Sequence, residues 1–302
     1  MVRHVIAGVD GSTESLAAAH WATREALRRG RELRLVHAWE WHPRPPASVP
    51  LGTGQRAWAE QILDEVARSV RAAHPGLGIE VRLVREAPVA ALLDASDEAE
   101  PLVLGSRGLS GLAGFAVGSV SQRVVARSTR PVVLVRSGEG AAGEHLPAPD
   151  GVSPDEIPEL PYRDVVLGLD VSHPCDELIE FAFAAARRRG TGLRVIHAYR
   201  VPAAYAVGDV RDPVPATELL AERERAVGAA LRPWCAKFPE VTVAGTVVEG
   251  RAAGALVDAS ADASLVVVGR RIRDARPGPH TGPVTHAVLH HVGCPVAVVP
   301  HT

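Results

Sequence analysis

The strongest constraint on the fold is that the chain contains the same pattern twice. Residues 5–12 (VIAGVDGS) resemble residues 165–172 (VVLGLDVS), which follow 160 positions later. Residues 33–39 (LRLVHAW) resemble residues 193–199 (LRVIHAY) at the same offset. Because the order and spacing of these segments are kept, the chain is a duplication of one large unit and not an array of short repeats. A length of 302 residues fits two such domains.

Within each unit, apolar strand patterns alternate with helical patterns. In the first unit the predicted strands cover 4–9, 33–38, 79–85, 101–104 and 131–135. The predicted helices cover 13–29, 55–73, 87–98 and 119–128. Gly30 is a natural residue to end the first helix. Apolar strands separated by helices form a parallel sheet that is covered on both faces. The expected fold class is α/β, with two tandem doubly wound open parallel sheets of five core strands each.

A segment of linker composition separates the two units. The stretch from Ser137 to Tyr162 holds five prolines, six acidic residues and no lysine or arginine. This composition is typical of a solvated tether, and an acidic partner-binding segment is the alternative. The predicted organisation is a first domain at 1–137, a linker at 138–162 and a second domain at 163–302.

Charge and composition exclude several classes of function. The net charge of −2 provides no basic field for nucleic acid or an anionic membrane. No apolar run approaches the roughly 18 residues of a membrane span, and the first residues enter a strand pattern without signal-peptide anatomy. Cys175, Cys235 and Cys294 form no CxxC, which predicts reduced core thiols and a cytoplasmic protein. The only lysine, Lys237, lacks flanking glycines, so a P-loop is excluded and Schiff-base chemistry is disfavoured.

A glycine-rich segment follows the fourth strand of the first unit. Gly105, Gly108, Gly118 and Ser119 have the spacing G-x2-G-x9-G-S. Glycine after a strand lets a ligand approach the backbone, and the helix that begins near Ser119 offers free N–H groups to phosphate. A triphosphate held in this way keeps uncompensated charge, which implies Mg²⁺. Arg107 is a further candidate for binding phosphate.

Two residues of this region have a structural alternative. Residues 119–122 (SVSQ) fit a capping box, in which the Ser119 hydroxyl closes the start of the helix instead of facing phosphate. Asp10 follows the first strand, where its carboxylate can accept hydrogen bonds from ribose hydroxyls or an adenine amino group. Its alternative role is to shape the turn before an N-cap at Ser12. Asp170 holds the same place in the second unit.

Together, the tandem units, the two strand motifs, the glycine spacing and the last strand of each unit resemble the universal stress protein family, in its ATP-binding branch. The resemblance covers nearly the whole chain except the linker. It implies an adenine nucleotide alpha-hydrolase-like fold with ATP and Mg²⁺ across the carboxyl edge of the sheet. The implied nucleotide-binding positions are Gly8, Asp10, Ala38, Gly105, Ser106, Arg107, Gly108, Gly118, Ser119, Val120 and Ser121. It also implies that residues 132–135 and 296–299 pair the units as an internal pseudo-dimer, with a homodimer as the alternative.

The second unit departs from the glycine pattern. Ile272 stands where the second glycine belongs, and Pro283 replaces the hydroxyl residue. Proline is tolerated at the first helical position, but a β-branched side chain at residue 272 hinders close backbone approach. Three arginines are candidates to compensate through their side chains, with a solvated basic loop as the alternative: Arg270, Arg271 and Arg273. We expect one good site and one weaker site, the latter formed by Gly168, Asp170, Gly269, Gly282 and Thr285.

Other chemistries find less support. His286 and His290 are spaced for a metal on one helix face, but no further ligand is evident, so we expect no metal site. His37 and His197 end matching strands and are interpreted as core histidines, with contact to a nucleotide as the alternative. No nucleophile elbow, HExxH motif or paired-carboxylate motif is present. The sequence predicts an ATP-binding stress-response regulator with an unidentified protein partner. The alternatives are a slow ATPase and an interaction scaffold that is independent of nucleotide.

Overall fold

The computed structural model describes residues 3–42, 49–50, 52–106, 117–138, 141–147, 160–200, 216–272 and 281–302. The first unit consists of β1 (His4–Gly8), α1 (Thr13–Arg29), β2 (Leu33–Trp39), α2 (Gln55–Ala73), β3 (Ile79–Arg85), α3 (Pro88–Asp97), β4 (Ala99–Ser106), α4 (Ser119–Arg127) and β5 (Val132–Arg136). The second consists of β6 (Asp164–Gly168), α6 (Asp176–Arg189), β7 (Leu193–Tyr199), α8 (Ala216–Lys237), β8 (Val243–Glu249), α9 (Ala252–Ser260), β9 (Ala263–Arg271), α10 (Pro283–His291) and β10 (Val296–His301).

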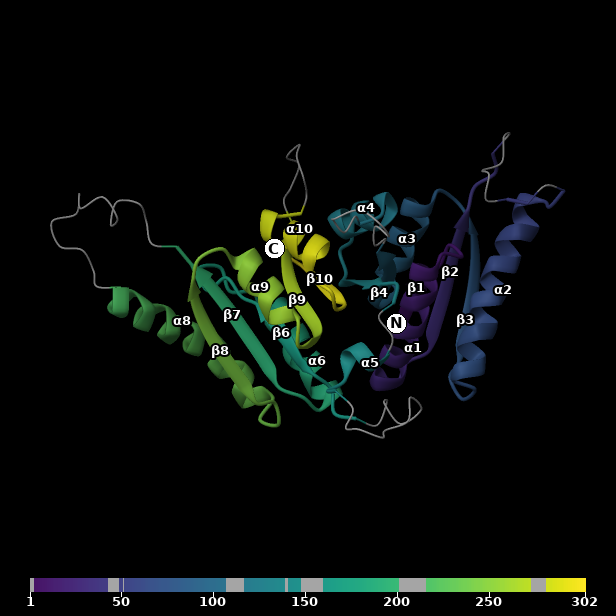
Figure 1. Cartoon of the computed structure of the whole chain (residues 1–302). Helices are drawn as coiled ribbons and strands as arrows, with labels where there is room; N and C mark the ends of the chain where they lie inside the picture. The colour runs from purple at the N-terminus through teal and green to yellow at the C-terminus, as the bar shows by residue number, and fades with distance from the viewer. Residues whose placement is uncertain are drawn as a thin grey trace.

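The strands of both units join into one sheet, in the order β3-β2-β1-β4-β5-β10-β9-β6-β7-β8. Within each unit all neighbouring strands are parallel, as the apolar strand patterns predict. Figure 1 shows the two halves side by side, with their outermost strands β3 and β8 at opposite ends of the molecule. The predicted fold class is therefore confirmed.

The two units meet through their last strands. β5 and β10 pair antiparallel, with Val133 opposite Ala297. Residues 132–135 and 296–299 are buried almost completely. The junction of the two units is therefore as inaccessible to solvent as the centre of either unit. The predicted pseudo-dimer through these strands is confirmed. Because all ten strands belong to one sheet, the carboxyl ends of the strands of both units lie along edges of that sheet.

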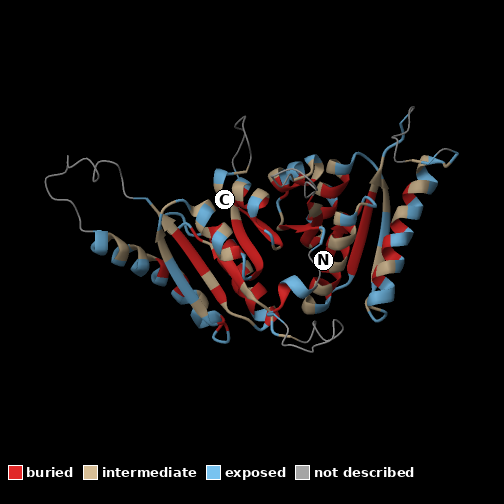
Figure 2. Cartoon of the chain, in the orientation of Figure 1, coloured by how far each residue is buried: buried red, intermediate tan, exposed pale blue. Residues whose placement is uncertain are grey.

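Helices cover both faces of the sheet because alternate side chains of each strand point to opposite faces. On one face the core contains Trp21 of α1, Leu63 of α2, Phe183 of α6 and Leu231 of α8. The other core contains Leu92 of α3, Val124 of α4, Leu256 of α9 and Val288 of α10. Figure 2 shows the resulting pattern, in which buried strands lie between helices that are exposed on their outer sides. No helix in the described ranges is long and apolar enough to cross a membrane.

The helix boundaries follow local signals in the sequence. α1 begins after Ser12, whose hydroxyl oxygen accepts a hydrogen bond from the backbone N–H of Ser15 at 3.1 Å. It ends at Gly30, which has the left-handed φ of 59° that glycine adopts without strain. α6 ends in the same way at Gly190, with φ 61°. These caps confirm the predicted bounds of α1.

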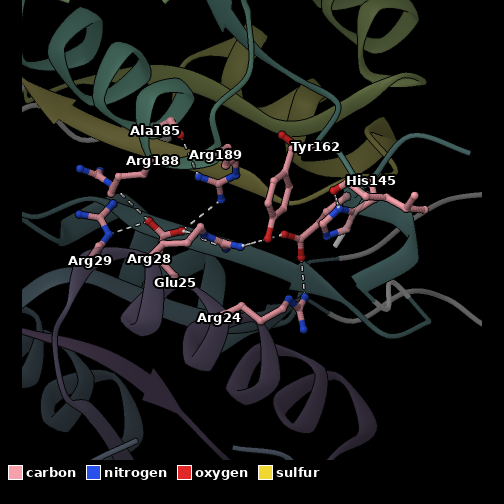
Figure 3. A network of polar contacts seen from close by, with 12 residues as sticks. Arg24, Glu25, Arg28, Arg29, His145, Tyr162, Ala185, Arg188 and Arg189 are labelled. Carbon is pink, nitrogen blue, oxygen red and sulfur yellow. Dashed lines mark hydrogen bonds and ion pairs between the residues drawn. The ribbon is translucent and has the colours of Figure 1, made fainter. Parts of the chain in front are cut away.

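A buried cluster of charges joins α1 to α6 (Figure 3). Glu25 of α1 is almost fully buried and forms ion pairs with Arg28, Arg29, Arg188 and Arg189. Burial alone raises the pKa of Glu25, but the surrounding arginines outweigh this effect and hold the pKa far below its ordinary value. The cluster therefore contributes a specific polar contact between the units besides the strand pairing.

The described ends of the predicted linker are packed, which corrects the prediction of a solvated tether for these residues. A short helix, α5 (Ala141–Glu144), precedes a β-bridge between His145 and Tyr162. Glu144 is buried and forms an ion pair with Arg24 of the first unit. At least one acidic residue of this segment, Glu144, therefore serves as the ion-pair partner of arginines in α1. Residues 148–159 lie outside the described part of the chain.

Candidate functional site

A cavity of about 870 Å³ opens at the carboxyl ends of the strands of the second unit. This volume lies within the range of small-molecule sites, and this edge of a doubly wound sheet is where such folds bind ligands. All the weaker-site residues predicted from the sequence line it: Gly168, Asp170, Gly269, Gly282 and Thr285. Ala198, the counterpart of Ala38, lines it as well. The structure thus brings residues from β6, β7, β9 and α10 to one cavity.

The cavity has an apolar part and a polar part. Ile196, Leu256 and Val268 contribute buried apolar side chains, which suit the flat face of a nucleobase. Arg271 and Thr281 supply polar groups beside the start of α10. An apolar slot next to a helix N-terminus and a cation can hold a ring system that carries an anionic group.

The two aspartates that follow β1 and β6 shape the same turn. Asp10 Oδ1 accepts hydrogen bonds from the backbone N–H of Ser12 at 3.0 Å and from its hydroxyl at 2.5 Å. Asp170 Oδ1 accepts from the backbone N–H of Ser172, also at 3.0 Å. Partial burial raises the pKa of Asp170, but bonds from Ser172 and His173 outweigh it, so the net pKa is lowered and the group is ionised. The turn-shaping role is therefore present in both units, and both carboxylates remain exposed at the site edge.

Glycines that the sequence assigns to ligand approach also lie where neighbouring atoms leave little room for a side chain. A Cβ at Gly105 would lie 2.7 Å from the backbone carbonyl carbon of Glu14, so β4 passes too close to α1 for a side chain. A Cβ at Gly8 would lie 2.6 Å from Leu104, and one at Gly168 would lie 2.9 Å from Leu256. At Gly269 the ring of His301 occupies that space. Close packing of α1 on β4 is thus a second reason for glycine at Gly105, whereas at the other three positions the neighbour is the end of a side chain.

The helix at the predicted phosphate position begins at a glycine. Gly118 is the N-cap of α4, and its carbonyl already accepts the backbone N–H of Gln122 at 2.9 Å. Ser119 is consequently the first helical residue, and the capping-box hypothesis, which needs Ser119 as the N-cap, is wrong. α10 has the same geometry, with Gly282 as N-cap and Pro283 in the first helical position. The prediction that proline would preserve this helix is confirmed.

Hydroxyls one turn further on tie both helices to the sheet. Ser121 Oγ donates a hydrogen bond to the carbonyl oxygen of Gly105 at 2.8 Å. Thr285 Oγ1 donates to the carbonyl oxygen of Gly269 at the same distance. Both residues are buried. This shared bond fixes each helix N-terminus over the end of the preceding strand, the geometry that directs free N–H groups at a ligand.

The arginines of the second unit differ from one another in exposure. Arg270 is buried, and its Nη2 donates a hydrogen bond to the carbonyl oxygen of Ser128 in the first unit. It does not extend into solvent as a loop arginine, because β9 continues through residue 271 and points the side chain at residue 270 toward α4. Arg271 is exposed at the cavity. Arg273 lies outside the described residues, as do Arg107 and Gly108 of the first unit.

The remaining predicted positions lie at the matching edge of the first unit. Gly8 and Ala38 end β1 and β2, Ser106 ends β4, and Ser119 and Val120 open α4. The core-histidine interpretation is confirmed. Nδ1 of His37 bonds to the carbonyl of Val9 and Nδ1 of His197 bonds to that of Leu169. No metal-binding group of three or more His, Cys, Asp or Glu occurs within the described ranges.

The three cysteines are free thiols, as predicted. Cys175 is buried, Cys235 is exposed and Cys294 is intermediate. The prediction that the cysteines lie in the core is therefore confirmed for Cys175 and wrong for Cys235. Cys175 caps α6 and lines the cavity.

Four cavity residues escaped the sequence analysis because they belong to the other unit. Residues 126–129, at the end of α4 in the first unit, line the cavity of the second. Within their own unit these residues close a helix and precede β5, and no pattern marks them as site residues. Only the antiparallel junction of β5 with β10 brings them to this place.

Two fused doubly wound units with a cavity at the carboxyl ends of parallel strands define a protein of the α/β class with a candidate ligand site at the sheet edge. The model of the universal stress protein family matches residues 1–136 and 161–300, and the chain belongs to this family. It is 33% identical to a universal stress protein of Mycobacterium tuberculosis, over 97% of this chain and 96% of that one.

A solved structure that covers the whole chain agrees with the fold. The crystal structure of a universal stress protein from Archaeoglobus fulgidus is similar with a TM-score of 0.62, at 18% identity, over 98% of both chains. A universal stress protein solved in complex with cAMP is 34% identical over 45% of this chain and 98% of its own, with a TM-score of 0.36.

Proposed function

We propose that the protein is a regulator that binds adenine nucleotides, with ATP in the first unit. The observation that carries the proposal is the cavity of the second unit. It is built from residues that correspond, one by one, to the predicted ATP positions of the first unit. Gly168, Asp170 and Ala198 correspond in this way to Gly8, Asp10 and Ala38. Because the strands of the two units share one topology, the corresponding residues of the first unit stand at the carboxyl ends of the strands of their own unit.

The first unit has the stronger donor set for a polyphosphate. The backbone N–H groups at the start of α4, from Ser119 onward, have no partner within the helix and carry its positive dipole end. Their position is fixed by the bond from Ser121 to Gly105. The full glycine spacing is present only in this unit.

Mg²⁺ would enter this site as the partner of the phosphates. The described residues offer no cluster of carboxylates, histidines or cysteines that could hold the ion by themselves. Its charge would offset that of the triphosphate. The nucleotide would then set the conformation that a protein partner recognises.

The test is to denature purified protein and identify the nucleotide that it releases. Gly118→Glu places a carboxylate at the predicted phosphate position, and Gly118 has an ordinary φ of −59° that accepts a side chain. Gly282→Glu is the matched variant in the second unit, where φ is −63° and a Cβ would meet nothing within 4 Å. We expect ATP from the wild type and from Gly282→Glu, and none from Gly118→Glu.

Release of ATP from Gly118→Glu but not from Gly282→Glu would move the ATP site to the second unit. Absence of any nucleotide in the wild type, even after incubation with Mg-ATP, would overturn the proposal. Steady-state phosphate release from the loaded protein separates a regulator from an ATPase, and we expect no sustained turnover.

A further inference from the structure

We infer that Arg270 of the second unit is a positioning residue for the phosphate site of the first unit, on which it acts through α4. The inference rests on the proposed nucleotide-binding function and adds a residue that lies outside the first unit altogether. Arg270 contacts the carbonyl end of α4, whereas the phosphates would lie at the N–H end of the same helix.

The carbonyl end of α4 is bound by a side chain from the other unit. Nη2 of Arg270, near the end of β9, donates a hydrogen bond to the backbone carbonyl oxygen of Ser128, the C-cap of α4. Both residues are buried. The last carbonyls of a helix have no partner within it and carry the negative end of its dipole. A buried cation at this place satisfies an acceptor and complements the dipole.

α10 ends in a contact of the same kind, in the opposite direction. Nη2 of Arg136, the last residue of β5, donates to the carbonyl oxygen of Leu289 in the last turn of α10, at 3.1 Å. Duplication alone does not explain the two contacts, because Arg270 corresponds to Ser106 and Arg136 corresponds to Pro300. Two unrelated positions thus place an arginine on the carbonyl end of a helix in the other unit.

The contact is stabilised by the cost of losing it. Burial lowers the pKa of Arg270, because a guanidinium that leaves water loses its hydration. The carbonyl oxygen of Ser128 and the negative end of α4 offset part of that cost. If α4 moved away, the cation would remain buried without this compensation. Arg270 and the end of α4 should therefore stay together.

α4 depends on its two ends for its position. Three of its nine residues are buried: Ser121, Val124 and Val125. Ser121 ties the first turn to the carbonyl oxygen of Gly105, and Arg270 ties the far end. A helix of this length, about 14 Å, moves as a rigid rod. Loss of the tether at the carbonyl end should therefore turn the N–H groups at the other end away from phosphate.

This geometry predicts an effect on phosphate and not on adenosine. The adenosine part of a nucleotide would lie on β1 and β2, near Asp10 and Ala38, and these strands pair with each other and with β3 and β4. α4 is not part of that pairing. A change in the position of α4 should therefore weaken ATP binding and leave adenosine binding as it is.

The experiment measures binding of radiolabelled ATP, with Mg²⁺, and of radiolabelled adenosine to the full chain by equilibrium dialysis. Every chain carries Ala198→Phe, which fills the cavity of the second unit two strands away from Arg270, so binding reports the first unit. Arg270→Met removes the charge and the donors but keeps a long side chain. We expect ATP to bind about tenfold more weakly to this variant, with unchanged adenosine binding.

Arg194→Met is the matched control. Arg194 lies in β7, and its Nη2 also bonds to carbonyl oxygens at the end of a helix, those of Ala259 at 2.9 Å and Asp262 at 3.0 Å. That helix is α9, which is not at a predicted phosphate position. Arg194→Met should change the affinity for neither ligand. A general disturbance of the second unit would affect this control and Arg270→Met alike.

Ser128→Ala tests the same contact from the side of the first unit. Ser128 Oγ donates to the carbonyl of Arg130 at 2.9 Å and accepts from its N–H at 3.1 Å, which fixes the turn that presents the Ser128 carbonyl to Arg270. The variant should weaken ATP binding about threefold and spare adenosine binding. Thermal unfolding followed by circular dichroism identifies folded variants. If Arg270→Met does not fold, the result for Ser128→Ala decides.

Three results would count against the inference. Unchanged ATP affinity in Arg270→Met, or in Ser128→Ala where that variant decides, would overturn it and leave the proposed function standing. Equal losses of ATP and adenosine affinity would have the same meaning, because they show a general effect on the fold. A chain with Arg270 intact that binds no ATP in its first unit would overturn the proposed function and this inference with it.

Discussion

Arg189 of the second unit donates a hydrogen bond from Nη2 to Oε2 of Glu25 in the first unit, at 3.1 Å. The two side chains are 0% and 1% exposed. The Glu25 carboxylate thus faces four arginines, two from each unit, and its negative charge offsets their mutual repulsion (Figure 3). Several arginines close together repel one another, and burial with Arg29 nearby lowers the pKa of Arg188 to about 10. The contact therefore makes the junction sensitive to the loss of a single negative charge.

Replacing Glu25 by Gln should destabilise the protein by roughly 3–5 kcal/mol, because it leaves buried cations without their partner. Urea unfolding followed by circular dichroism measures the change. Glu60→Gln is a control, since Glu60 pairs with Arg56 on the exposed side of α2 and such pairs contribute little. Equal stability of the two variants would contradict the importance of the cluster.

The same carboxylate should make stability depend on acid pH. The pKa of Glu25 in the folded protein lies far below its ordinary value of 4.5. Its contribution is therefore complete above the unfolded pKa and is lost as the pH falls toward the folded value. Unfolding free energies measured from pH 7 down to pH 3 should fall more steeply for the wild type than for Glu25→Gln. If the unfolding free energies of the two proteins fall equally with pH, other carboxylates determine the acid sensitivity of the protein.

Gly105→Ala should destabilise the first unit by about 1–3 kcal/mol, since the added Cβ would press on the backbone of Glu14 and force α1 to shift. Gly254→Ala is the opposite case. Gly254 lies inside α9, is exposed and has nothing within 4 Å of an added Cβ. It should stabilise by roughly 0.5–1 kcal/mol through helix propensity. Thermal unfolding of both variants provides the comparison, and a harmless Gly105→Ala would refute the packing explanation.

The thiols should differ sharply in reactivity. Burial raises the pKa of Cys175 to about 11, so at pH 8 its thiolate is scarce as well as shielded. Cys235 is exposed. Iodoacetamide at pH 8, followed by peptide mass spectrometry, should label Cys235 and spare Cys175, while urea-unfolded protein should label both. Rapid labelling of native Cys175 would indicate that the cavity beside it opens.

The duplicated pattern predicted most of the fold. The bounds of α1 and β3 agree with the predicted ranges to the residue, and α2 lies where a helix near 55–73 is predicted, because caps and periodicity are local signals. β4 is longer than predicted, running from Ala99 to Ser106. Its ends are defined by pairing with β1 and β5, and strand pairing is not visible in the strand's own residues.

The candidate site was predicted less completely. Residues that repeat between units, such as Asp170 and Gly282, were found because duplication marks them. The wall contributed by residues 126–129 was missed, and Ser119 was offered as an N-cap although Gly118 has that role. Both lie between β4 and β5, where the course of the backbone is set by contacts outside that segment.

By itself the sequence determined the repeated α/β units, their helix ends and the glycine positions, since these depend on periodicity, capping and the absence of side chains within short stretches. Only the tertiary structure decided which residues of one unit reach the other. Arg189 meets Glu25, and Arg270 meets Ser128, because the antiparallel junction of β5 and β10 sets the units in one register. Such contacts join residues more than a hundred positions apart, and no local pattern encodes them.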